Sequence, residues 1–147
     1  MVKLVEARVQ HRFESAAEQL YDAWLDHKQV RQWLGKSLRN MGLSGEISRV
    51  EIDAQIGGKF TFSDMRETGE AVHWGYYREL QRPRRIVFSW FVSEEDEIAD
   101  SSLVTLAIEA QDKGCTATIS HCLDAQYAEY IPQTEKGWKA MLSSSSD

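Results

Sequence analysis

The sequence predicts an α+β domain in which a curved antiparallel sheet of six or seven strands wraps around a long C-terminal helix. Two observations lead to this fold class. One strand pattern is followed by two short helix patterns, six further strand patterns and a final helix pattern, which is not the alternation typical of a parallel sheet. Strands linked by hairpins must also bury one face, and the C-terminal helix is the only element left to fill the concave side.

The first third of the chain supplies one strand and two helices. Residues 5–13 alternate between apolar and charged side chains, which predicts a strand. A capping box that begins at Ser15 predicts a helix, and a similar cap at Asp26 begins a second short helix that we expect to end near Gly35. Glycine and serine residues in 36–45 then predict a mobile loop, which, with Trp24 and Trp33 as anchors of the two helices, would form a pocket entrance.

Alternating patterns predict six strands in the middle of the chain. Gly57-Gly58 joins the first two in a hairpin. The later strands are separated by a turn at Arg82-Pro83, by the acidic stretch 94–100 and by a turn at 112–114. We expect the strands at about residues 49–54, 60–63, 72–80, 86–92, 102–109 and 116–123.

Apolar residues recur at intervals of three and four from Tyr127 to Leu142, which predicts the final helix. Pro132 suits a first helical turn, so we expect the main helix to begin near it. Gly137 inside this helix costs about 1 kcal/mol relative to Ala, and we expect close approach of another backbone to be its reason. The polar residues 143–147 predict a frayed tail.

Composition argues against several classes of protein. A chain of 147 residues fits one domain over its whole length. The net charge of −6 disfavours a nucleic-acid partner. The sequence has no apolar run of about 18–20 residues, as a membrane span needs, and its first 14 residues lack a signal peptide's apolar region. Two cysteines make no disulfide framework, so we expect reduced thiols and a cytoplasmic location. No histidine or cysteine spacing predicts a metal site, and no cofactor is expected.

Five motifs in order carry a resemblance to a known family. They are YDAWLDHKQVRQWLG (21–35), IGGKFTF (56–62), HWGYYREL (73–80), RPRRIVFSW (82–90) and GW (137–138). Together they resemble the SRPBCC (START-like) superfamily, and specifically proteins similar to the activator of Hsp90 ATPase homologue 1 domain. The resemblance covers the chain from about Val5 to Leu142. It implies a helix-grip (START/Bet v 1-like) fold with a cavity between the sheet and the C-terminal helix.

The resemblance also implies a range of functions. Relatives include lipid and hormone carriers, polyketide cyclases and co-chaperone domains. The final helix looks short for this family, which predicts a more open cavity. Nothing in the chain matches the separate N-terminal domain of eukaryotic Hsp90 activators, which argues against Hsp90 as the partner.

Strand parity predicts which side chains line that cavity, because alternate residues of a strand share a face. Gly75 would leave room between two of them. The alternative is that the apolar members simply fill a solid core. The predicted ligand-binding residues are Phe60, Phe62, Asp64, His73, Tyr77, Phe88, Trp90, Ile119, His121, Trp138 and Met141.

Three polar residues in this set are candidates for acid–base chemistry. His73 and His121 could hydrogen-bond a ligand or transfer a proton, with Asp64 nearby. The alternative is a structural histidine held by a backbone carbonyl or by water.

The sequence therefore leaves three functions open. The first is binding of a small hydrophobic or amphipathic molecule without catalysis. The second is a cyclase- or dehydratase-like enzyme that uses the pocket histidines or Asp64 for proton transfer. The third is a protein-interaction domain in the manner of Hsp90 activators. Exposed sheet edges and aromatic residues would also allow a homodimer.

Overall fold

The computed structural model describes residues 3–146, which form a seven-stranded antiparallel sheet and the helices packed on it. The strand order is β1-β7-β6-β5-β4-β3-β2. The elements are β1 (Leu4–Phe13), α1 (Ala17–Ala23), α2 (His27–Asn40), β2 (Ile47–Ile52), β3 (Lys59–Arg66), β4 (Gly69–Gln81), β5 (Arg85–Ser89), α3 (Glu94–Ala99), β6 (Leu103–Ala110), β7 (Cys115–Asp124), the 3₁₀ helix η1 (Ala125–Tyr130) and α4 (Ile131–Ser144).

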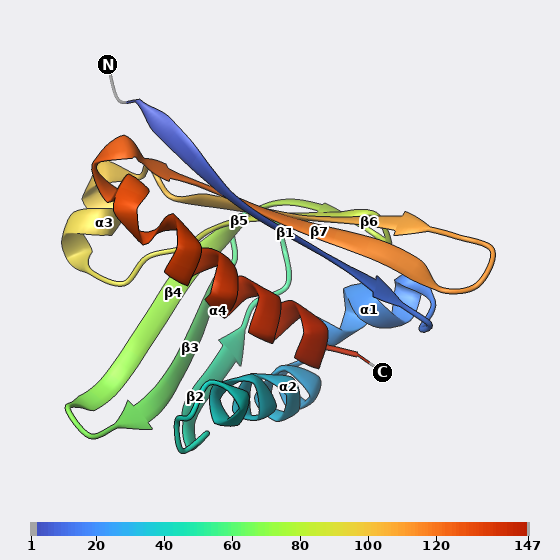
Figure 1. Cartoon of the computed structure of the whole chain (residues 1–147), viewed down its shortest axis with the longest axis horizontal. Helices are drawn as coiled ribbons and strands as arrows, with labels where there is room; N and C mark the ends of the chain where they lie inside the picture. The colour runs from blue at the N-terminus through green and yellow to red at the C-terminus, as the bar shows by residue number, and fades with distance from the viewer. Residues whose placement is uncertain (1–2, 147) are drawn as a thin grey trace.

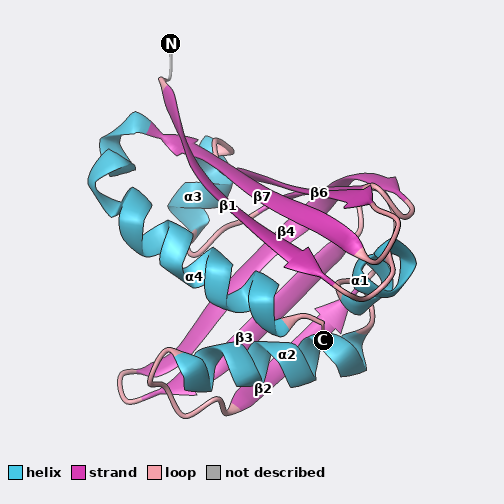
Figure 2. Ribbon diagram, turned by 45° about the vertical axis from the view of Figure 1, so that its right-hand side comes forward, coloured by secondary structure: helices cyan, strands magenta, loops and turns pink. Residues whose placement is uncertain are grey.

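The sheet is strongly bent, and α4 lies in its concave trough (Figure 1). Strands β1, β7 and β6 cross above the helix, and β2, β3 and β4 run below it. Helix α2 lies beside α4 and packs on β2, as Figure 2 shows from a second side. The α+β fold predicted from the sequence, a curved antiparallel sheet around the C-terminal helix, is therefore confirmed.

Helix α2 differs from its prediction because it runs through Asn40 and does not end near Gly35. Its 14 residues make it as long as α4, so it is not a short helix. The prediction of a loop from residue 36 was wrong for its first half, since Leu38 is buried there and a helix continues. Gly35 serves close packing instead: a Cβ at this position would lie 3.3 Å from the carbonyl oxygen of Gly45.

The acidic stretch 94–100 was predicted as a break between strands, but it contains helix α3. The Ser93 hydroxyl accepts a hydrogen bond from the Asp96 amide at 3.2 Å, which caps the helix. Acidic side chains in the first turn also favour a helix, because they face the positive end of its dipole. Glu97 ties α3 to the outer face of β4 by accepting hydrogen bonds from Trp74 and Tyr76.

The end of α4 is also more ordered than the predicted frayed tail. The helix continues through Ser144, and Ser145 beyond it is still buried. The Ser146 hydroxyl lies 2.6 Å from that of Ser15, at the corner between β1 and α1. Asp147, the last residue of the predicted tail, lies outside the described residues.

Side chains of α4 also bind the backbone of β1 along the edge of the sheet. Glu135 accepts a hydrogen bond from the Arg8 amide at 2.9 Å. The Lys139 ammonium donates to the Gln10 carbonyl oxygen. These two bonds hold the helix against β1 on one side of the trough.

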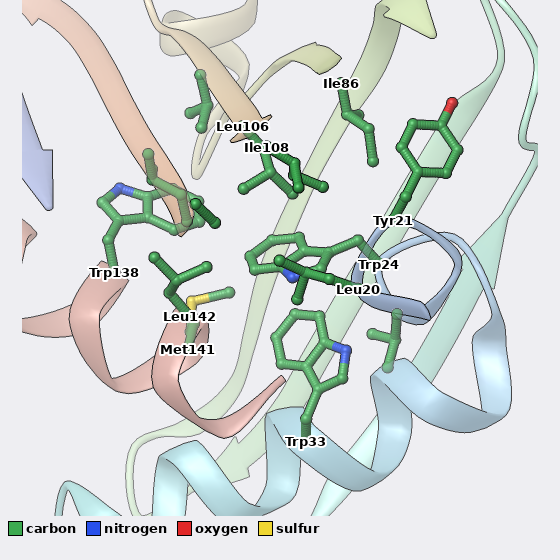
Figure 3. Packing of buried hydrophobic residues seen from close by; sticks show 14 of the residues in the cluster. Leu20, Tyr21, Trp24, Trp33, Ile86, Leu106, Ile108, Trp138, Met141 and Leu142 are labelled. Carbon is green, nitrogen blue, oxygen red and sulfur yellow. The ribbon is translucent and has the colours of Figure 1, made fainter. Parts of the chain in front are cut away.

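The trough is solid at the end that carries the C-terminus of α4, which we call the packed half. Figure 3 shows Trp24 of the α1 end and Trp33 of α2 meeting beside Leu142 of α4. The two indole rings have centroids 4.5 Å apart, and Trp33 donates to the Ala23 carbonyl at 2.9 Å. Trp24 and Trp33 therefore belong to the core and not to a pocket entrance.

Two further observations bear on the predicted environment of the chain. Cys115 and Cys122 both lie on β7 and form no disulfide within the described residues 3–146, and their odd spacing leaves Cys115 buried and Cys122 half-buried. No helix within residues 3–146 is long and apolar enough to cross a bilayer.

Candidate ligand-binding cavity

A cavity of about 520 Å³ occupies the other end of the trough, which we call the hollow half. Its walls come from the C-terminal part of α2, from β3 and β4, from the segment around α3, from the end of β7, and from η1 and α4. The cavity therefore lies between the C-terminal helix and the sheet.

The structure places seven of the eleven predicted ligand-binding residues on the cavity wall. The other four are packed in the core, and three of them, Phe60, Tyr77 and Phe88, lie beside Trp24 at the α1 end of the sheet. Phe60 shows this packing, with its ring 5.4 Å from those of Tyr77 and Phe88. The wall residues are Phe62, Asp64, His73, Trp90, His121, Trp138 and Met141; the core residues are Phe60, Tyr77, Phe88 and Ile119.

Aromatic rings form a continuous row along one side of the cavity. The His73 ring stacks on Trp90 at 5.0 Å between centroids, with the planes 21° apart. Trp90 meets Trp138 edge to face at 4.9 Å, and Trp138 meets His121 in the same manner at 5.7 Å. This row joins β4 to β7 through α4 and gives a ligand a continuous aromatic surface.

Both ring nitrogens of His121 are engaged in hydrogen bonds. Nδ1 lies 3.0 Å from the indole nitrogen of Trp138, and Nε2 lies 2.7 Å from the hydroxyl of Ser102. Burial lowers the pKa of His121 to about 4, so the ring is neutral at pH 7. A proton transfer at His121 would break one of these bonds, which favours a structural role, although the partners are the side chains of Trp138 and Ser102 and not the predicted backbone carbonyl or water.

His73 is different, because it faces the cavity without a hydrogen-bond partner among residues 3–146. Burial first, and then the positive charge of Arg66, lower its pKa to about 4, while the Asp64 carboxylate opposes this shift. The ring is therefore neutral at pH 7 and offers one donor and one acceptor nitrogen to a ligand.

Asp64 is committed to an ion pair with Arg66. The Arg66 guanidinium donates to both carboxylate oxygens, at 2.9 and 3.3 Å, and only 4% of Asp64 is exposed. Of the three predicted acid–base groups, His73 alone therefore has atoms free to exchange a proton with a bound molecule.

Gly137 of α4 lies on the cavity wall, and sequence reasoning misread its role. A Cβ at this position would meet no atom within 4 Å, so no other backbone approaches it. The expectation of a close backbone contact was wrong, and the missing side chain instead leaves the cavity space beside Trp138.

Sequence reasoning also missed wall residues on α2 and at its C-cap, since it placed a loop from residue 36 and did not assign Leu34 of the predicted helix to the cavity. Leu34, Leu38 and Met41 recur at helical spacing and face the cavity together. That spacing was a usable signal. Ser102, Tyr127 and Tyr130 were missed as well; the two tyrosines are half exposed and stand at the rim.

Comparison with known proteins gives a family and a set of similar folds. The model of the family described as activator of Hsp90 ATPase homolog 1-like protein matches residues 14–144. No curated protein matches the chain.

Several solved structures share the fold. A Staphylococcus aureus protein of unknown function is 17% identical with a TM-score of 0.78, over 98% of this chain and 92% of that one. A Chromobacterium violaceum protein is 20% identical with a TM-score of 0.74, over 96% and 94%. An AHSA1-like protein from Aeromonas hydrophila is 17% identical with a TM-score of 0.73, over 96% and 89%. At these identities the likeness shows the fold alone.

Proposed function

Since the chain belongs to the family of activator of Hsp90 ATPase homolog 1-like proteins, we propose that it binds a small, largely apolar ligand in the cavity between α4 and the sheet. The family's fold is often used for ligand binding. The cavity is the observation that carries the proposal. Its volume of about 520 Å³ falls within the roughly 300–1,000 Å³ of small-molecule sites in proteins.

The character of the wall supports the same proposal. Phe62, Trp90 and Trp138 supply aromatic surface, and Leu38 and Met141 supply aliphatic surface. Polar groups such as His73 and Ser102 stand among these apolar side chains, and placed polar groups of this kind fix the orientation of a largely apolar ligand. A solid core would have filled this space, because protein interiors pack nearly as densely as organic crystals.

Acid–base catalysis has less support than binding. It would depend on His73, since His121 and Asp64 are held by their partners. A single neutral imidazole on an aromatic wall suits recognition of a polar group on the ligand as well as it suits proton transfer.

The proposal is tested by filling the cavity without unfolding the protein. Binding of the neutral fluorescent probe N-phenyl-1-naphthylamine would be titrated against the wild type and Gly137→Leu. Leucine favours a helix over glycine, and its side chain would enter the cavity because a Cβ there meets no atom within 4 Å. We expect the affinity to fall at least about tenfold while the melting temperature does not fall.

The matched control is Lys136→Leu, which adds the same residue to the same helix one position earlier. Lys136 is exposed and points about 100° away around the helix, so its substitution should leave probe binding unchanged. Absence of binding to the wild type, or equal binding by Gly137→Leu and the wild type, would contradict the proposed function.

A further inference from the structure

A chain of hydrogen bonds runs through the cavity wall and ends at Ser102. It begins at the indole nitrogen of Trp138 on α4 and passes 3.0 Å to Nδ1 of His121 on β7. It continues 2.7 Å from Nε2 of His121 to the hydroxyl oxygen of Ser102, just before β6. All three residues line the cavity.

The indole of Trp138 determines the direction of the hydrogen bonds in this series. An indole N–H is a donor only, so Nδ1 of His121 must accept. A neutral imidazole carries its single hydrogen on the other nitrogen, so Nε2 donates to the Ser102 oxygen. The lowered pKa of the buried His121 keeps the ring in this neutral form at pH 7. The Ser102 oxygen is thus an acceptor toward His121, and its own hydrogen is left to donate elsewhere.

That hydrogen is available to a ligand. Ser102 lines the cavity, and no group within residues 3–146 accepts a hydrogen bond from its hydroxyl. Its carbonyl oxygen accepts from the Trp90 amide at 3.2 Å, which fixes the backbone beneath the side chain. Donors linked in one direction also polarise one another, so the last O–H is a better donor than an isolated serine.

The charges around the cavity restrict which acceptor fits. Three carboxylates lie on the wall and its rim, at Asp64, Asp96 and Asp124. The guanidinium of Arg66 is the one side chain of opposite charge on the wall described here, and it already pairs with Asp64. An anionic acceptor would meet net repulsion, whereas a neutral oxygen would not.

From this geometry we infer that the ligand carries a neutral hydrogen-bond acceptor of the carbonyl type, and that Ser102 is the residue that selects it. This inference rests on the proposed function, because it names the polar group of the ligand that occupies the same cavity. The aromatic row of Trp90 and Trp138 would hold the apolar part of that ligand.

The test compares two neutral probes that differ in one carbonyl group. The ketone is 6-propionyl-2-(dimethylamino)naphthalene, and the reference is 6-propyl-2-(dimethylamino)naphthalene, in which a methylene group replaces the carbonyl. The wild type should bind the ketone about five- to tenfold more tightly, as one hydrogen bond predicts. The carboxylate 6-(dimethylamino)-2-naphthoate should bind more weakly than the ketone.

Ser102→Ala should reduce the preference for the ketone to about one and shift the emission of the bound ketone to the blue. Ser102→Cys keeps the shape with a weaker donor and should give the same loss if the alanine variant is unstable. Ser101→Ala is the matched control, because Ser101 also lines the cavity but belongs to no part of the hydrogen-bond chain.

The outcomes separate the inference from the proposed function. A ketone preference that survives in both Ser102 variants, or carboxylate binding tighter than ketone binding, would overturn the inference while cavity binding stands. Failure of every probe to bind the wild type would overturn the proposed function and the inference with it.

Discussion

The two halves of the trough between α4 and the sheet are built by the same helix and the same sheet, yet one is solid and the other hollow. In the packed half, the space beside Trp24 and Phe60 measures about 10 Å³. In the hollow half, the cavity measures about 520 Å³. Leu142 of α4 enters the first half and Gly137 faces the second.

The difference comes from what the other helices insert into the trough. Trp24 and Trp33 place two indole rings in the packed half, and Leu20 and Val30 complete it with no exposed surface. In the hollow half α2 contributes only side chains that stop at the wall, such as Leu38. One stretch of α4 therefore packs in the core and stabilises the fold, while another stretch borders the cavity. Because the packed half supplies the core, the hollow half does not need to be filled.

The largest expected effect on the free energy of unfolding comes from a comparison of Leu142 and Met141, two neighbouring residues of α4 that face different halves of the trough. Leu142→Ala should lower the free energy of unfolding by about 4 kcal/mol, because Leu142 is fully enclosed. Met141→Ala should cost no more than about 2 kcal/mol, because Met141 borders a space that already exists. Urea denaturation of both variants measures the difference, and equal losses would break the distinction between the halves.

The second prediction concerns pH and the two histidines of the cavity wall. The pKa of His121 is about 4 in the folded protein against 6.5 ordinarily, so between these values the unfolded chain binds the extra proton and the folded chain does not. The free energy of unfolding should therefore keep its maximal value above pH 6.5 and decrease as the pH falls toward 4. His121 accounts for about 3 kcal/mol of that fall, and His73 adds to it in the same direction.

Urea denaturation at several pH values measures this fall, and NMR titration of the imidazole signals assigns it. Replacing either histidine with Asn should flatten the pH dependence. If the imidazole signals of His73 and His121 titrated near pH 6.5, the two rings would be more exposed to water than the structure indicates.

The smallest effect is expected from Gly137 in the hollow half, and it has the opposite sign to that of Gly75 in the packed half. A Cβ on Gly75 would lie 1.8 Å from the Ser89 carbonyl oxygen and 2.9 Å from the Phe60 ring. Gly75→Ala should therefore destabilise the protein by about 2 kcal/mol or more. Gly137→Ala should stabilise it by up to about 1 kcal/mol, because helix propensity improves and nothing is displaced. Thermal unfolding compares them, and a loss of stability in Gly137→Ala would mean that the hollow half is tighter than described.

Much of the fold could be predicted because strand and helix patterns are local in the sequence. Alternation in β1 and β7 and the three–four spacing in α4 each depend on a few neighbouring residues. The second half of α2 was not predicted because Gly35 is typical of a helix end. The structure shows that Gly35 instead allows the backbone of Gly45 to approach, and no local sequence pattern indicates a contact between two segments.

For the site, the sequence could predict only which face of the sheet each side chain occupies, because strand parity gives no more than that. Parity assigns a side chain to a face but not to a position along the trough, so Phe60 and Phe62 looked equivalent. One is packed against Tyr77 and the other borders the cavity. The bond between Trp138 and His121 joins two elements, and its continuation to Ser102 adds a third segment, so no spacing in the sequence could indicate it.

The hydrogen bonds from α4 to β1 have a consequence for the behaviour of the protein at high concentration. An edge strand with free backbone groups is a template on which strands of other molecules can add and aggregate. Glu135 and Lys139 occupy the Arg8 amide and the Gln10 carbonyl on that edge. The helix that closes the cavity thus also shields the sheet from intermolecular strand pairing along β1.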